Sequence, residues 1–268
     1  MNALVLGANG QLGTELVRLL GTDCAVPHEQ LSITDAEAVD ALVASRRPEL
    51  VFNCAAYNFV DRAESEPDLA FAVNAQGALH VARSCRRQGA TLVHFSTNFV
   101  FDGAHDQPYV EADEPAPLSV YSRSKLEGER LALQAGGHVL IVRTAAVFGG
   151  PQSFPQRILE RARSGEKLRV VSDQRVNPTF ARDLAAAALE MAEHGMAGIV
   201  HAVAEGCAGW DDFARSVLAE GAIEMEVESI PTGAYPAAAR RPLNGCLAST
   251  RFKALRPWQN ALHEALNP

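Results

Sequence analysis

A turn of three glycines between a strand pattern and a helix pattern is the feature that most limits how this chain can fold. Residues 3–6 are apolar throughout, as expected for a strand buried on both faces, and Gly7, Gly10 and Gly13 follow at intervals of three. Residues 11–20 then carry leucine and valine at helical spacing. Such a turn lets the backbone approach a pyrophosphate and lets the helix pack closely on its strand. The start of the chain therefore predicts a dinucleotide-binding unit.

The same rhythm of strands and helices continues along the chain. Short apolar runs predict further strands, and periodic segments between them predict helices. The predicted strands cover residues 24–27, 50–54, 91–95, 139–142, 168–171 and 198–202, and the predicted helices cover residues 36–44, 67–87, 120–134, 154–163 and 181–192. Strands that alternate with helices pair in parallel through right-handed crossovers. We therefore expect an α/β fold with a Rossmann-type doubly wound parallel sheet.

The rhythm loosens after a Gly-Gly-Pro sequence at residues 149–151, and prolines and glycines become frequent near the end of the chain. This change predicts a smaller C-terminal substrate-binding lobe that closes over the mouth of the sheet. We assign residues 1–149 and about 181–205 to the dinucleotide-binding domain, and residues 150–180 and 206–268 to the lobe.

Charge and composition argue against several classes of function. The formal net charge is −8 and the pI is near 5.5, so we expect no nucleic-acid partner. The chain begins with an apolar strand pattern and has no apolar window of membrane-spanning length, so we expect neither a signal peptide nor a membrane association. The five cysteines and eight histidines show no metal-ligand spacing. We therefore expect reduced cysteines in a cytoplasmic protein without a metal site.

The sequence leaves open which nicotinamide cofactor binds. A carboxylate at the end of the second strand would bind the adenosine ribose and disfavour a 2′-phosphate. Glu29 lies near that position, but Pro27 and His28 shift the register. Asp35 could meet the adenine edge or could cap the helix that follows it. Both NADPH and NADH are therefore retained.

A second pattern lies near the middle of the chain, where Lys125 follows Tyr121 by about one helical turn. Alone, this spacing also suits a surface contact, but its place after a fourth strand favours catalysis. The ammonium group should lie close to the phenol and favour its ionised form. Thr97 follows the predicted strand 91–95, at the end where ligands bind. A phenol and a hydroxyl there could both hydrogen-bond to a ketone oxygen that gains negative charge during reduction.

Longer phrases spread over nearly the whole chain strengthen this interpretation. They include Gly7-Ala8-Asn9-Gly10-Gln11-Leu12-Gly13, Asn53-Cys54-Ala55-Ala56-Tyr57, Val60-Asp61, Ala72-Val73-Asn74-Ala75, Val100-Phe101-Asp102-Gly103, Gly128-Glu129, Arg143-Thr144, Asp173-Gln174 and Arg241-Pro242. In these phrases the chain resembles the extended short-chain dehydrogenase/reductases, and within them the dTDP-4-dehydrorhamnose reductase family.

The resemblance implies reduction of the 4-keto group of dTDP-4-dehydro-6-deoxy-L-mannose to dTDP-L-rhamnose by NADPH or NADH. Tyr121 would be the proton donor, Lys125 its partner and a ribose ligand, and Thr97 would polarise the carbonyl. The residues implied at the cofactor are Gly7, Asn9, Gly10, Gln11, Leu12, Gly13, Asp35, Ala55, Ala56, Tyr57, Tyr121 and Lys125.

At the substrate, the resemblance implies Thr97, Asn98, Ala146, Phe154 and Arg241. Two of these positions depart from the family pattern. Asn98 stands where the family usually has aspartate, and Ala146 stands where it usually has a tryptophan that faces the sugar. Loss of an indole removes a large apolar contact, so the pocket should be wider or differently filled. We expect the reaction type to be kept, and the substrate to be a related 4-keto-6-deoxyhexose or another nucleotide sugar.

Two other functions stay open. A nucleotide-sugar epimerase or dehydratase would use the same tyrosine but would regenerate a tightly held NAD; the Gly10–Gly13 phrase and the lack of a carboxylate beside Thr97 argue against it. A non-catalytic nucleotide-binding regulatory subunit would not need Thr97, Tyr121 and Lys125. Some family members bridge two subunits through magnesium held by glutamates. Glu15 stands at one such position, but a solvated helix charge is the favoured interpretation, and a homodimer is left open.

Overall fold

A six-stranded parallel sheet forms the centre of the protein in a computed structural model that describes residues 2–267. Its strand order is β10-β5-β4-β3-β1-β2, and every neighbouring pair is parallel. The strands are β1 (Ala3–Leu6), β2 (Ala25–Val26), β3 (Leu50–Asn53), β4 (Thr91–Thr97), β5 (Val139–Thr144) and β10 (Gly198–His201). The predicted doubly wound α/β fold is confirmed.

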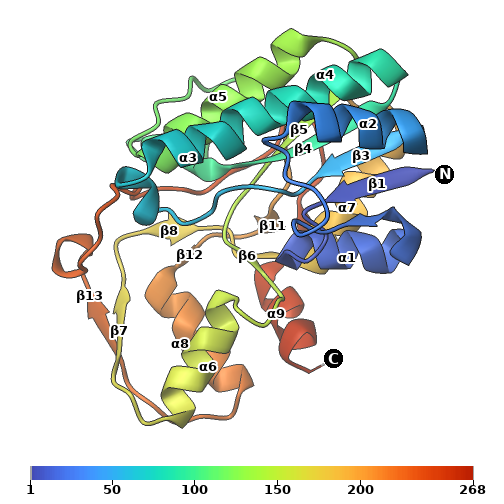
Figure 1. Cartoon of the computed structure of the whole chain (residues 1–268). Coiled ribbons are helices and arrows are strands. Elements are labelled where there is room, and N and C mark those ends of the chain that lie inside the picture. The colour runs from blue at the N-terminus through green and yellow to red at the C-terminus, as the bar shows by residue number, and fades with distance from the viewer. Residues whose placement is uncertain (1, 268) are drawn as a thin grey trace.

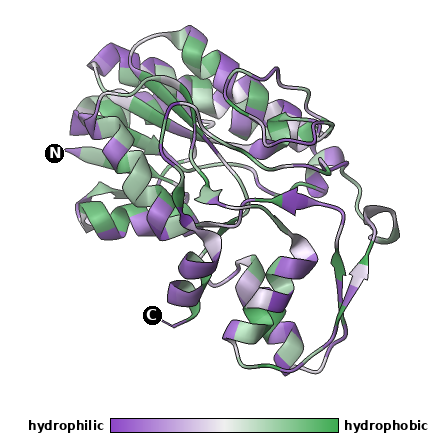
Figure 2. Ribbon diagram, turned by 180° about the vertical axis from the view of Figure 1, so that it is seen from behind, coloured by the Kyte–Doolittle hydropathy of each residue, from purple (hydrophilic) through white to green (hydrophobic). Residues whose placement is uncertain are grey.

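Helices cover both faces of this sheet (Figure 1). One face carries α1 (Gln11–Leu20) and α7 (Ala181–Glu193), and the other carries α2 (Ala36–Arg46), α4 (Ala78–Gln88) and α5 (Val120–Ala135). Successive residues of β1 pack alternately into the two hydrophobic cores. Leu4 and Leu6 pack toward α2 and α4, and Val5 packs toward α1 and α7. Figure 2 shows the resulting hydrophobic colouring of the strands and the polar outer faces of the helices.

The helix predicted over residues 67–87 is divided in the structure. It consists of α3 (Pro67–Phe71), a π-helical segment (Ala72–Gly77) and α4. Within the π-helical segment, the Asn74 carbonyl oxygen lies where a Cβ on Gly128 of α5 would approach it to 2.1 Å. The two helical segments therefore pack backbone against backbone, which helical periodicity alone does not predict.

The smaller lobe lies below the sheet in Figure 1. It contains α6 (Phe154–Arg163), α8 (Trp210–Glu220) and the parallel pair of β7 (Leu168–Val171) and β13 (Val227–Ile230). An aromatic cluster around Phe213, with Phe148, Phe154, Trp210 and Trp258, forms much of its core. The remaining elements are β6 (Val147–Phe148), β8 (Arg175–Val176), β9 (Thr179–Phe180), β11 (Ala204–Glu205), β12 (Ala208–Gly209), β14 (Leu255–Pro257) and α9 (Trp258–Leu266).

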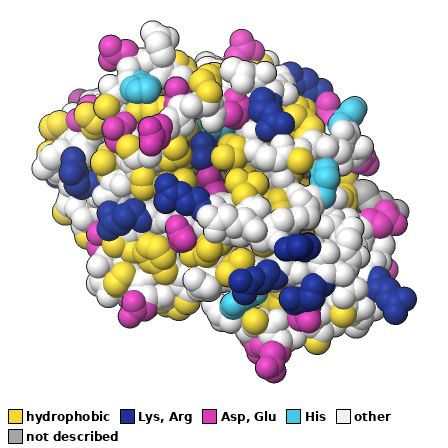
Figure 3. Space-filling model, turned by 90° about the horizontal axis from the view of Figure 1, so that it is seen from above, with side chains coloured by type: hydrophobic (Ala, Val, Ile, Leu, Met, Phe, Trp, Pro, Cys, Tyr) yellow, Lys and Arg dark blue, Asp and Glu magenta, His cyan; other side chains and the backbone are white. Residues whose placement is uncertain are grey.

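The surface carries charges of both signs. On the face seen from above, acidic and basic side chains are interspersed (Figure 3). Within residues 2–267, none of the helices combines the length and the apolar character that crossing a bilayer would need.

Candidate active site

The glycine turn connects β1 to α1 and forms one wall of a pocket at the carboxyl end of the sheet. Gly7 has a φ of +75°, a conformation that residues with a side chain rarely adopt. A Cβ on Gly13 would lie 2.3 Å from the carbonyl oxygen of Gly7. These two glycines are therefore required by the close packing of α1 on the turn.

The start of α1 is open toward the pocket. Gly10 is the residue before the helix, and no side chain caps the first N–H groups. A Cβ on Gly10 would meet only the oxygen of Gly7, at 3.4 Å, and nothing else within 4 Å. Uncapped N–H groups at the positive end of a helix bind anions, so a dinucleotide pyrophosphate fits this turn. Beside the turn, Nδ2 of Asn9 donates to Oε2 of Glu29 at 3.4 Å.

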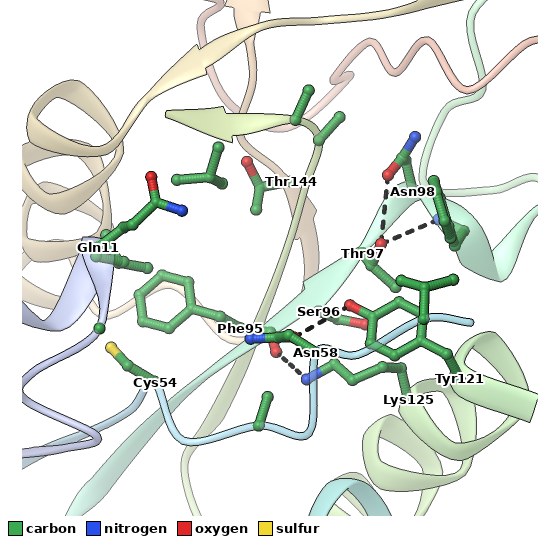
Figure 4. Close-up of a pocket in the computed structure, with 18 of the residues that line it drawn as sticks. Gln11, Cys54, Asn58, Phe95, Ser96, Thr97, Asn98, Tyr121, Lys125 and Thr144 are labelled. Carbon is green, nitrogen blue, oxygen red and sulfur yellow. Dashed lines mark hydrogen bonds between the residues drawn. The ribbon is translucent and has the colours of Figure 1, made fainter. Parts of the chain in front are cut away.

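The opposite wall comes from α5 and the end of β4. The hydroxyl of Ser119 accepts a hydrogen bond from the N–H of Ser122, and the hydroxyl of Ser122 accepts one from the N–H of Ser119. This capping box fixes the start of α5. Figure 4 shows Tyr121 and Lys125 projecting from α5 beside Thr97, with Gln11 across the pocket from them.

The pocket is a single cavity of about 430 Å³ that receives residues from both lobes. The structure brings together in it most of the residues predicted for catalysis and for the cofactor. Its lining consists of Gly10, Gln11, Leu12, Gly13, Cys54, Ala56, Asn58, Val60, Phe95, Ser96, Thr97, Asn98, Phe99, Tyr121, Lys125, Thr144, Ala145, Ala146, Val147, Val176 and Trp210. A glycine turn suited to a dinucleotide therefore shares one cavity with the threonine, tyrosine and lysine.

The expectation that Lys125 makes the phenol more acidic is wrong for this structure. Burial raises the pKa of Tyr121 to about 12, although a hydrogen bond with Thr97 acts in the opposite direction. The ammonium group of Lys125 instead donates to the carbonyl oxygen of Phe95 at 2.7 Å. Burial lowers the pKa of Lys125 to about 8, against the attraction of Glu129. Removal from water disfavours the charged form of both groups.

Thr97 and Asn98 hold the substrate side of the pocket in a fixed geometry. Thr97 Oγ1 accepts a hydrogen bond from the N–H of Phe99 at 3.1 Å and donates to Oδ1 of Asn98 at 3.3 Å. Asn98 Nδ2 donates to the carbonyl oxygen of Gly245 at 2.9 Å. Asn98 therefore connects the end of β4 to the C-terminal segment of the chain.

Three residues predicted at the cofactor make contacts within the protein. Asp35 caps α2, since its carboxylate accepts from the N–H of Ala38 at 3.0 Å. The hydroxyl of Tyr57 donates to Oε2 of Glu66 at 2.6 Å. Ala55 packs directly behind the glycine turn, because its N would lie 2.7 Å from a Cβ on Gly7. A cofactor contact of Asp35, Ala55 or Tyr57 stays a prediction.

Two predicted substrate residues lie outside the pocket lining. The ring of Phe154 packs against Trp210, with the ring centroids 4.8 Å apart, and Trp210 is the residue that reaches the cavity. The guanidinium of Arg241 forms two hydrogen bonds with the carboxylate of Asp61, at 2.6 and 3.0 Å. Ala146 lines the cavity, as Thr97 and Asn98 do, and its φ is +43°.

Asn58 and Trp210 line the pocket but were not predicted from the sequence. Asn58 accepts a hydrogen bond from the Tyr121 hydroxyl at 3.4 Å, and it lies on a loop after β3 with no pattern to mark it. Trp210 begins α8, a helix that the sequence analysis did not predict. An indole therefore lines a cavity in which Ala146 occupies the position expected to carry one.

Two other groups of residues considered in the sequence lie away from the pocket. The carboxylate of Glu15 pairs with Arg18 at 2.9 Å and with Arg182 at 3.5 Å, and residues 2–267 contain no cluster of histidine, cysteine and acidic side chains that could hold a metal. The expectation of five reduced cysteines is wrong for Cys207 and Cys246, which the structure joins in a disulfide with their Cα atoms 6.1 Å apart. The fold brings these two residues together from 39 positions apart, which spacing could not reveal.

Known proteins resemble this chain over its whole length. The family described as RmlD substrate binding domain matches residues 1–268. The dTDP-4-dehydrorhamnose reductase of Mycobacterium tuberculosis is 39% identical, over 98% of this chain and 91% of the relative. A Streptomyces antibioticus protein described as a probable dTDP-4,6-dihydroxy-2-methyloxan-3-one 4-ketoreductase is 38% identical, over 99% of this chain and 94% of the relative.

A solved structure agrees with these sequence matches. The dTDP-4-dehydrorhamnose reductase of Bacillus anthracis, in complex with NADP, superposes with a TM-score of 0.95 at 30% identity, and the match covers 99% of this chain and 98% of that one. The family match, the identities of 30 to 39% and the coverage of at least 91% of each chain agree. The chain therefore belongs to the dTDP-4-dehydrorhamnose reductase family.

Proposed function

We propose that this chain is an NAD(P)H-dependent reductase of the 4-keto group of a dTDP-4-keto-6-deoxyhexose. The observation that carries the proposal is that Gly10–Gly13 and Thr97, Tyr121 and Lys125 line one cavity. Relatives named as dTDP-4-dehydrorhamnose reductases support the substrate class.

Tyr121, Thr97 and Lys125 have different roles in the transfer of the proton. When bound, a reduced nicotinamide supplies hydride to the carbonyl carbon. Tyr121 Oη donates its proton to the carbonyl oxygen, and a phenol with a pKa of about 12 keeps that proton available at neutral pH. Thr97 Oγ1 would provide a second hydrogen bond to the same oxygen by turning its one hydroxyl proton away from Oδ1 of Asn98. The Lys125 ammonium, one turn along α5, would have to turn from the carbonyl oxygen of Phe95 to stabilise the phenolate that remains.

The glycine turn and the smaller lobe would hold the two ligands. The open start of α1 at Gly10 would bind the pyrophosphate of the cofactor, and Trp210 would close the sugar side of the cavity with an apolar surface. Glu29, next to Asn9, is the carboxylate that would reach an adenosine ribose, and NADPH and NADH are both retained as cofactors. The substrate class is also kept broad, since a relative at 38% identity has a different sugar in its name.

The test is consumption of NADPH or NADH with a panel of dTDP- and UDP-linked 4-keto sugars. We expect Tyr121→Phe to lower kcat by about 10²- to 10⁴-fold with little change in cofactor affinity. Tyr235→Phe is the matched control, because that side chain is half exposed and outside the cavity, and it should leave kcat unchanged. Unchanged turnover of Tyr121→Phe would remove Tyr121 from the mechanism.

The same assay separates the other functions. An epimerase or dehydratase would convert the sugar without net loss of NAD(P)H, and a regulatory subunit would bind the cofactor without turnover. We also propose a cytoplasmic location and no nucleic-acid partner, the second of which the net charge of −8 supports, while a homodimer is left open.

A further inference from the structure

Two oppositely charged side chains are buried directly beneath the pocket. Glu129 on α5 and Arg143 on β5 are each 1% exposed. Nε and Nη2 of Arg143 donate to the two carboxylate oxygens of Glu129 at 2.9 and 2.6 Å. Glu129 also accepts a hydrogen bond from the hydroxyl of Ser96. Apolar residues of similar volume would stabilise such a site as well or better, so the buried charges need an explanation other than stability.

The contacts of Glu129 connect the elements that carry the catalytic side chains. Glu129 lies one helical turn after Lys125 and two turns after Tyr121, on the same face of α5. Ser96 immediately precedes Thr97 on β4, and Ser96 is paired in the sheet with Arg143 of β5. One carboxylate therefore contacts the helix with the phenol and the ammonium, and the strand with the threonine.

The groups that face Lys125 make Glu129 its negatively charged neighbour. Burial raises the pKa of the Cys54 thiol after β3 and lowers the pKa of His94 on β4, so both are neutral at pH 7. Tyr121, on the same helix, is also neutral there. Arg143 on β5 carries a positive charge, but its guanidinium is directed at Glu129. Among these neighbours, Glu129 makes the larger electrostatic contribution that favours the protonated amine of Lys125, ahead of Cys54.

We propose that Glu129 is a positioning residue for the reduction: its carboxylate fixes α5 against β4 and β5, and its charge keeps the Lys125 amine protonated beneath Tyr121. This inference rests on the proposed function for its meaning in catalysis. The electrostatic effect of Glu129 on Lys125 can be measured without turnover.

The small number of lysines makes it practical to measure the pKa of Lys125 directly. The chain has only Lys125, Lys167 and Lys253, so an NMR titration with ¹³Cε-labelled lysine gives a separate signal for the buried amine. Lys125→Met assigns that signal by its loss. In the unsubstituted protein we expect Lys125 to titrate with a pKa of about 8.

The decisive variants separate charge from geometry. Glu129→Gln keeps the shape but removes the charge, and we expect the Lys125 midpoint and the alkaline limb of kcat/KM to fall together by about 1 pH unit. Glu129→Asp keeps the charge but withdraws it by one methylene, so we expect kcat to fall while the Lys125 midpoint shifts less than in Glu129→Gln. Glu127→Gln, on the exposed side of the same helix, should change neither.

The proposal can be tested even if Glu129→Gln does not fold. Glu129→Gln leaves Arg143 buried without a partner, and the double variant with Arg143→Gln removes both charges and should restore the fold. A Lys125 midpoint and alkaline limb that stay at the unsubstituted values in a folded Glu129→Gln variant, or that do not differ between the double variant and Arg143→Gln alone, would overturn the proposal. If the protein reduces no keto sugar but the Lys125 midpoint falls, the proposed function fails and the electrostatic contact stands.

Discussion

Two substitutions in the glycine turn should change different properties of the protein. Gly13→Ala should lower its stability, and Gly10→Ala should weaken cofactor binding. Gly13→Ala places a Cβ 2.3 Å from the Gly7 carbonyl oxygen and 2.9 Å from the Cα of Ala8. Both contacts are to backbone, so α1 must move by roughly 1 Å to relieve them, at a cost of about 3 kcal/mol. At roughly 2–4 °C per kcal/mol for a domain of this size, the melting temperature should fall by about 10 °C.

Gly10→Ala should affect binding instead of folding. Its φ of −75° suits any residue, and its Cβ would meet only the Gly7 oxygen at 3.4 Å. The methyl group would occupy the open start of α1 where the pyrophosphate is proposed to bind. We expect a melting temperature within about 2 °C of the unsubstituted protein. We also expect a rise in the Kd of NADPH of at least about tenfold, equal to about 1.4 kcal/mol.

The assays are thermal unfolding followed by circular dichroism, and titration of NADPH fluorescence. The reasoning fails if Gly13→Ala melts with the unsubstituted protein, because the backbone contact would then cost nothing. It also fails if Gly10→Ala binds NADPH with unchanged affinity, because the space at that glycine would then be empty in the complex.

Three further predictions come from contacts elsewhere in the fold. The pKa of Glu111 is lowered from 4.5 to about 2 because hydrogen bonds outweigh burial. The stabilisation that Glu111 gives is therefore complete above pH 4.5 and is lost as the pH falls toward 2. Glu111→Gln should unfold at a lower urea concentration than the unsubstituted protein at pH 7, and the two unfolding midpoints should coincide near pH 2. Gly128→Ala should lower the melting temperature by several degrees, since its Cβ would lie 2.1 Å from the Asn74 oxygen, and an unchanged value would contradict the backbone packing of α5. A double-mutant cycle with Asp61→Asn and Arg241→Met should give a coupling of about 1 kcal/mol in unfolding free energy, and a value of zero would show that this two-bond pair does not stabilise the fold.

Local patterns were sufficient to predict most of the sheet domain. The strand at residues 3–6, the glycine turn and the helix at 11–20 are encoded within a few neighbouring residues, and the structure has Ala3–Leu6 and Gln11–Leu20. Tyr121 and Lys125 share a helix face for the same reason. Their convergence with Thr97 could be inferred because parallel strands bring their carboxyl ends to one edge.

Features that depend on distant parts of the chain could not be predicted in this way. Strand β13 pairs with β7 across almost sixty residues, and α8 follows a stretch whose glycines obscure its start. The direction of the Tyr121 pKa was wrong because burial depends on what packs around the helix, whereas the four-residue spacing reports only the partner. The contact of Trp210 with the cavity depends on how the lobe folds back on the sheet.

The order in which the central sheet is completed has a consequence for synthesis on the ribosome. β5 ends at Thr144, but its outer neighbour β10 ends only at His201, after the chain has passed through the lobe. α7, which covers one hydrophobic face, also belongs to this late segment. At about 5–20 residues per second, the nascent chain exposes an unpaired strand edge and a bare apolar face for roughly 3–11 seconds. During this interval the exposed edge must be kept from pairing with other polypeptides in the cell.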